Sequence, residues 1–86
     1  MNKELQELTE SIETVIVTAK LMGYQTVTIK KGSWRISKSN KQYLKIYIVT
    51  GLTLVVTSSE TNDRYISIGK SHKEKLDHLQ KLMEGL

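Results

Sequence analysis

Apolar and polar residues alternate most regularly between Tyr43 and Ser58, where the sequence reads YLKIYIVTGLTLVVTS. This is the longest apolar, β-branched stretch of the chain, and a Thr-Gly-Leu break at residues 50–52 interrupts it. Alternation with a period of two predicts strands that bury one face. We expect a hairpin whose loop is the break, so that Leu54 lies opposite Ile48. One long strand with a glycine bulge is the alternative.

Two shorter segments, residues 24–30 and 33–38, precede this stretch and predict another hairpin with its turn at residues 31–32. An uninterrupted ladder would place four apolar side chains on one face. These pairs would be Val27 with Ile36 and Ile29 with Trp34. A turn at residues 39–41, where asparagine tolerates positive φ, would extend the same buried face along the next strand. Its members there would be Leu44, Ile46 and Ile48.

Residues 59–63 predict a polar turn, and Arg64 to Gly69 predict a last strand with Ile66 and Ile68 facing inward. This strand completes a meander in which each strand pairs with the next along the chain. A slip of one residue in any register would move every side chain of that strand to the other face.

Helical periodicity predicts one helix at each end of the chain. In residues 2–22 apolar side chains recur every three or four positions, and Gly23 follows as a C-terminal stop. The β-branched run at residues 14–18 opposes helix formation, so the second half of this helix is where the prediction would fail. Ser71, with Glu74 three residues later, predicts a capping box that starts a second amphipathic helix.

These elements predict one α+β domain over residues 1–86. Its parts are an N-terminal helix, an antiparallel β-meander of four to five strands and a C-terminal helix, with both helices on one face of the sheet. Trp34 would then lie in the core, whereas a slipped register would expose it. The other face stays open. The residues expected there are Thr26, Thr28, Lys30, Arg35, Ser37, Tyr43, Lys45, Tyr47, Val49, Thr53, Val55 and Thr57.

Charge is distributed unevenly along the chain. The chain has 86 residues and a net charge of +4. Residues 20–49 contain no acid, whereas the first helix carries four glutamates. The bases of residues 20–49 are Lys20, Lys30, Lys31, Arg35, Lys38, Lys41 and Lys45. Positive charge is therefore concentrated in the first half of the predicted sheet.

The sequence offers little for catalysis. It has no cysteine, which excludes disulfides and thiol chemistry. His72 and His78 lie six residues apart on a predicted helix, so they point in different directions and do not suggest a metal site. We expect a non-enzymatic protein without a cofactor or metal. With no signal peptide and no apolar run of membrane-spanning length, we expect it in the cytoplasm and away from membranes.

Tyrosines with interleaved bases on an open sheet favour contact with nucleic acid, because rings stack on bases while cations meet phosphates. The residues expected to make this contact are Lys30, Arg35, Lys38, Lys41, Tyr43, Lys45 and Tyr47. The alternative function is a protein-interaction or inhibitor protein, such as a phage or mobile-element accessory factor that blocks a host enzyme or defence system. It would dock on an acidic partner surface or at a sheet edge, and the open face or edge would also serve a homodimer. A purely structural face is the third interpretation, since tyrosine and threonine suit any half-exposed strand.

Overall fold

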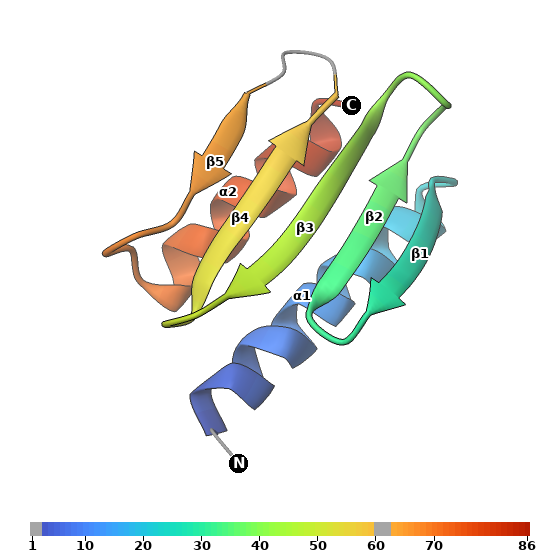
Figure 1. Cartoon of the computed structure of the whole chain (residues 1–86). Helices are drawn as coiled ribbons and strands as arrows, with labels where there is room; N and C mark the ends of the chain where they lie inside the picture. Colours follow the sequence, from blue (N-terminus) through green and yellow to red (C-terminus); the bar gives the residue numbers. More distant parts are fainter. Residues whose placement is uncertain (1–2, 60–62) are drawn as a thin grey trace.

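The computed structural model describes residues 3–59 and 63–86, and these residues form two helices and five strands (Figure 1). The elements are α1 (Lys3–Leu21), β1 (Gln25–Lys30), β2 (Ser33–Ser37), β3 (Tyr43–Val49), β4 (Thr53–Ser58), β5 (Arg64–Ile66) and α2 (His72–Glu84). The strands form one antiparallel sheet in the order β1-β2-β3-β4-β5. The predicted α+β architecture is confirmed. The centre of the turn predicted at residues 59–63, residues 60–62, lies outside the described residues.

The two central registers are as expected from the sequence. Trp34 pairs with Ile46, and Ile48 pairs with Leu54 across a loop at residues 50–52. The stretch from residue 43 to residue 58 is therefore a hairpin and not a single bulged strand. Its loop needs two successive residues at positive φ, Gly51 at 78° and Leu52 at 60°. Glycine adopts this conformation without strain, which is why the chain turns there.

The predicted register of the β1–β2 hairpin is wrong. Lys30 pairs with Ser33 as expected, but the ladder then shifts at a bulge, so that Thr28 pairs with Trp34 and Val27 with Arg35. Paired residues share a face, so the bulge moves Val27 to the open face and sets Thr28 on the helix side. Val27 is 54 % exposed. Thr28 is also exposed, which shows that the helices cover the sheet incompletely at this edge. The hydroxyl of Thr28 therefore stays in contact with water.

The inward face predicted for β5 is also wrong. Tyr65 pairs with Val56 on the helix side, while Ile66 pairs with Val55 on the open face and is 44 % exposed. Ile68, beyond the strand, is exposed as well. Two interactions explain this orientation: the Tyr65 ring stacks on α2, and the main-chain N–H of Leu54 donates to the buried hydroxyl of Ser67 at 2.7 Å.

The first helix continues through its β-branched run to Leu21. Val15 and Ile16 are buried there together with three other residues of the predicted stripe. Tertiary burial of these side chains outweighs their weak helix propensity. The helix then ends at Gly23, whose φ of 93° suits a left-handed stop.

The second helix begins after the predicted N-cap residue, Ser71. Ser71 has extended backbone angles, and its hydroxyl accepts from the N–H of Glu74 at 3.3 Å and donates to the Glu74 carboxylate at 3.1 Å. This helix buries Leu79 and Met83. A hydrogen bond of 3.0 Å between Ser11 and His72 connects the two helices.

Both helices lie behind the sheet in Figure 1, α1 behind the β1–β3 half and α2 behind β4 and β5. The core lies between the helices and the sheet, and Trp34, at 2 % exposure, belongs to it as predicted. No helix among the described residues is long and apolar enough to cross a membrane. The face of the sheet toward the viewer carries no helix (Figure 1).

Candidate functional site

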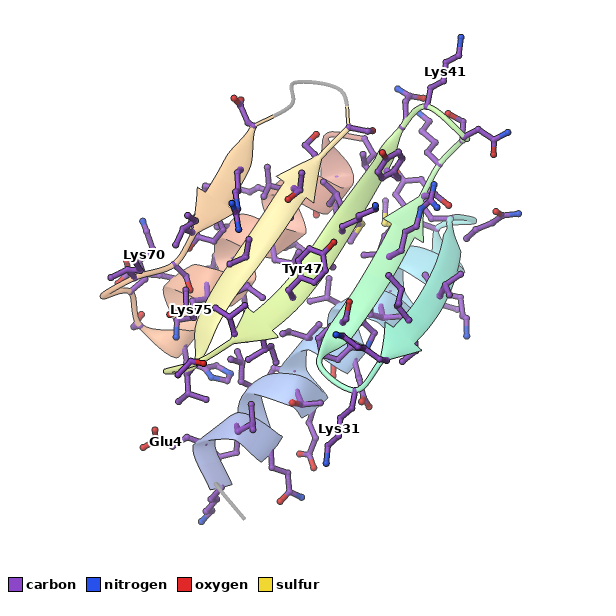
Figure 2. All side chains as sticks on the ribbon, viewed as in Figure 1. Glu4, Lys31, Lys41, Tyr47, Lys70 and Lys75 are labelled. Carbon is purple, nitrogen blue, oxygen red and sulfur yellow. The ribbon has the colours of Figure 1, made fainter. Side chains whose placement is uncertain are left out.

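The face of the sheet that carries no helix (Figure 1), called the open face below, is the candidate binding surface. Its members follow from the register, because they alternate with core residues on each strand. Tyr47 lies near its centre, on β3 (Figure 2). None of the described residues on this face is acidic. They are Gln25, Val27, Lys30, Ser33, Arg35, Ser37, Tyr43, Lys45, Tyr47, Val49, Thr53, Val55, Thr57, Arg64 and Ile66.

Three cations form a row across the strands of this face. Arg35 on β2 pairs directly with Lys45 on β3, which pairs with Thr57 on β4, which pairs with Arg64 on β5. Neighbouring strands lie about 4.8 Å apart, so the row is about 14 Å long. Like charges directly opposite each other destabilise a sheet. The arrangement concentrates positive charge where an anion could compensate it.

Tyr43 lies beside this row. The guanidinium carbon of Arg35 is 4.3 Å from the centre of the Tyr43 ring, and the Lys45 ammonium is 5.7 Å from it. Both distances are within the range of cation–π attraction. Arg35, Tyr43 and Lys45 therefore form one cluster, which the sequence analysis predicted from their alternation.

Tyr47 has a different environment. Its cross-strand neighbours are Ser33 on β2 and Val55 on β4. Ser33 is 1 % exposed and Val55 is 4 % exposed, although neither helix reaches this side of the sheet. Long side chains of the open face itself must cover these two residues, and Tyr47 is next to both. Val55 is therefore not part of the accessible surface that was expected.

Two polar atoms beneath this surface lack hydrogen bonds. The hydroxyl of Ser33 and the Nε of Arg35 are buried, and neither has a partner among the described residues. Such groups are rare in folded proteins, because burial removes water without replacing it. They lie two residues apart on the same face of β2.

The three other predicted lysines, Lys30, Lys38 and Lys41, lie in different places. Lys30 belongs to the open face through its pairing with Ser33. Lys38 instead donates from its ammonium to the main-chain oxygen of Leu86, just beyond α2, at 3.1 Å. Lys41 extends from the tip of its loop (Figure 2). The structure thus brings Lys30, Arg35 and Lys45 to one face, whereas Lys38 is held by the helix layer.

Four members of the face were not predicted from the sequence. The assumption of an unbroken ladder between β1 and β2 concealed Gln25 and Val27, and the hydrophobic pattern of β5 concealed Arg64 and Ile66. In β5 the buried face could be built from Ile66 or from Tyr65. The more hydrophobic choice, Ile66, is incorrect. Only the later Ser67 and His78 contacts identify the inward side.

A cavity of about 480 Å³ lies on the helix side, between β5 and α2. Tyr65 and His78 form part of its wall, with ring centres 3.8 Å apart and planes 6° from parallel. Burial lowers the pKa of His78, and the charges of Lys70 and Lys81 lower it further. No group of three or more histidine or carboxylate side chains within residues 3–59 and 63–86 is arranged to hold a metal ion.

Comparison with known proteins found no match to this chain, whether among protein-family models, curated protein sequences or solved structures. We therefore infer a function from the geometry of the open face.

Proposed function

We propose that this protein binds single-stranded nucleic acid on the open face of its sheet. The observation that carries the proposal is the directly opposed pair Arg35 and Lys45, beside Tyr43, on a face whose described residues include no acid. A phosphate backbone would neutralise the two cations, and an unpaired base would supply a flat surface for the tyrosine ring. Duplex is a poorer fit, because its bases are already stacked on one another and a flat sheet does not enter a groove.

Salt dependence tests the proposal. Binding of a fluorescent random single strand is expected to weaken linearly with the logarithm of salt concentration, with a slope near −0.7 for each phosphate contacted. Arg35→Gln and Lys45→Gln should each make this slope shallower by about 0.7. Lys20→Gln is the control, because it removes the same charge from the exposed end of α1. Absence of binding at low salt, or equal slopes in all three variants, would refute the proposal.

Two substitutions of Tyr43 test whether its ring stacks on a base. Stacking on an aromatic side chain contributes about 1–3 kcal/mol per base, so Tyr43→Ala is expected to weaken binding about five-fold to more than a hundred-fold. Tyr43→Phe retains the ring and should bind nearly as the wild type does. If both variants lose affinity equally, the hydroxyl and not the ring makes the contact.

A protein partner is the second candidate function, and the exposed apolar residues of the same face favour it. Val27, Val49 and Ile66 are each about half exposed around the cationic row. Nucleic acid has little use for aliphatic side chains, whereas a protein interface combines them with arginine. The partner surface would be acidic with an apolar margin, or it would belong to a second copy of this chain.

Two substitutions separate the candidates. Val27→Ser with Ile66→Ser removes aliphatic surface and leaves every cation in place. Oligonucleotide affinity is expected to be unchanged in this variant. The second function would be favoured by two results together. The wild type would not bind the oligonucleotide, and the double variant would lose affinity for a purified acidic partner or lose self-association in sedimentation.

A further inference from the structure

Ser33 is the residue of the open face that its position explains least. It lies on the side of the sheet without helices, yet it is 1 % exposed and its hydroxyl has no hydrogen-bond partner within the described residues. On an uncovered sheet, water could form hydrogen bonds with a serine hydroxyl. The Ser33 hydroxyl is buried instead, so it is a hydrogen-bond donor without an acceptor directly beneath the proposed binding surface.

Other donors surround it. Lys30 is the neighbour of Ser33 on β1, and Tyr47 is its neighbour on β3. Arg35 follows two residues later on the same face, with its own Nε buried and unpartnered. Cross-strand neighbours have Cβ atoms about 5 Å apart, and same-face neighbours on one strand are about 7 Å apart. Lys45, opposite Arg35, is within reach along the diagonal.

We propose that Ser33, Arg35 and Lys45 form a phosphate-binding subsite for which Tyr47 is a movable cover. The inference rests on the proposed function, because the phosphate is one of the nucleic-acid backbone. A phosphate group presents several acceptor oxygens, which can take hydrogen bonds from a hydroxyl, a guanidinium and an ammonium together. Filling the subsite would satisfy both buried donors.

Opening the subsite requires side-chain rotations and no change of backbone. Tyr47 would turn away from Ser33, and the charged ends of Arg35 and Lys45, which lie over the Tyr43 ring, would turn toward the phosphate. Tyr47 is half-buried on a central strand that pairs on both sides, so β3 itself is held in place. Rotation would uncover Ser33 and leave the Tyr47 ring at the surface, where it can stack on a base.

The first experiment titrates inorganic phosphate into the ¹⁵N-labelled protein, with chloride at equal ionic strength as reference. Phosphate-specific shifts are expected at the Ser33 amide and at the Arg35 side-chain Nε–H. Ser33→Ala should weaken this binding about tenfold, since a hydrogen bond to a charged group is lost. Ser37→Ala is the matched control on the same strand and face, and it should behave as the wild type does.

Stability separates a binding role from a structural one. Since the Ser33 hydroxyl has no hydrogen-bond partner in the part of the chain that the structure describes, Ser33→Ala is expected to unfold at the same denaturant concentration as the wild type, or higher. An alanine variant that is less stable would show that the hydroxyl supports the fold. That result, absence of phosphate-specific shifts, or equal losses in Ser33→Ala and Ser37→Ala would overturn the subsite.

Tyr47→Ala provides an independent test of the cover. Inorganic phosphate should bind this variant at least as tightly as the wild type, while a thymidine oligonucleotide should bind about five-fold or more weakly because a stacking ring is gone. Loss of inorganic phosphate binding in this variant would overturn the cover. Oligonucleotide binding that is unaffected by Ser33→Ala would overturn the subsite and leave the proposed function standing. Binding of inorganic phosphate without binding of the oligonucleotide would overturn the proposed function and leave the phosphate subsite standing.

Discussion

At the scale of single residues, the stacked rings of Tyr65 and His78 hold the short strand β5 against α2. The Lys70 ammonium also lies 5.8 Å from the centre of the Tyr65 ring. Burial raises the pKa of Tyr65, with Glu74 raising it further, and burial lowers the pKa of His78. The folded protein therefore favours the neutral form of both rings.

The lowered pKa of His78 predicts a dependence of stability on pH. Below its usual pKa of 6.5 the unfolded chain takes up a proton on this histidine more readily than the folded one does. The free energy of unfolding is expected to be highest above pH 6.5 and to fall as pH decreases from there through the lower folded-state pKa of His78. Urea titrations across this range measure it.

His78→Phe retains a ring against Tyr65 and removes the titration, so its stability should vary less over the same pH range. His72→Gln leaves the stack intact and serves as the control. A pH dependence that is unchanged in His78→Phe would show that another group causes it.

Ser67 stabilises the fold through a buried hydrogen bond to β4. It is 1 % exposed, and its hydroxyl accepts a hydrogen bond from the main-chain N–H of Leu54. Ser67→Ala would leave that N–H buried without a partner at a cost of about 1–3 kcal/mol in the free energy of unfolding. Ser37→Ala, which removes a half-buried hydroxyl from the open face, should change it by less than about 0.5 kcal/mol. Equal losses in chemical denaturation would contradict this account.

At the scale of elements, the sequence predicts the central strands well and the outer strands poorly. β2, β3 and β4 each have neighbours on both sides, and their core residues are clearly more hydrophobic than the alternate ones, so the register follows from the pattern. β1 and β5 lie at the edges, where one face is only partly covered. There Val27 and Ile66 can be exposed at little cost, and hydrophobicity no longer identifies the inward side.

The candidate site follows the same rule. Arg35, Tyr43, Lys45 and Tyr47 belong to central strands, and the structure places all four on the open face as predicted. Ser33 could not be recognised from the sequence as a site residue, since an unpartnered hydroxyl is a property of the folded surface. The hydrogen bond of Lys38 could not be predicted from the sequence, because its partner, Leu86, lies 48 residues later.

At the scale of the whole molecule, β3 passes through the middle of both the core and the site. Ile46 faces the helices and is fully buried, while its sequence neighbours Lys45 and Tyr47 face outward. Stability and binding are therefore assigned to alternate residues of one strand. Substitutions on β3 should change one property at a time.

Ile46→Ala tests this separation. Truncating a fully buried isoleucine is expected to lower the free energy of unfolding by about 2–5 kcal/mol. Val49→Ala, at the exposed end of the same strand, should lower it by about 0.5 kcal/mol or less. Denaturant titration of the two variants measures both changes. Similar losses would mean that Val49 contributes to the packing as much as Ile46 does, contrary to its exposure of 46 %.

The order of the strands also has a consequence for how quickly the chain reaches this structure. Each strand lies beside the one that precedes it in the sequence, so the first three pairings require closing loops of only a few residues. Closing short loops costs little conformational entropy, and topologies dominated by local pairings fold fast. The cationic row from Arg35 to Arg64 is assembled by successive hairpins, with no strand inserted from a distant part of the chain. A nascent chain could therefore form the Arg35–Lys45 pair once β3 has left the ribosome, before α2 has emerged to cover the other face of the sheet.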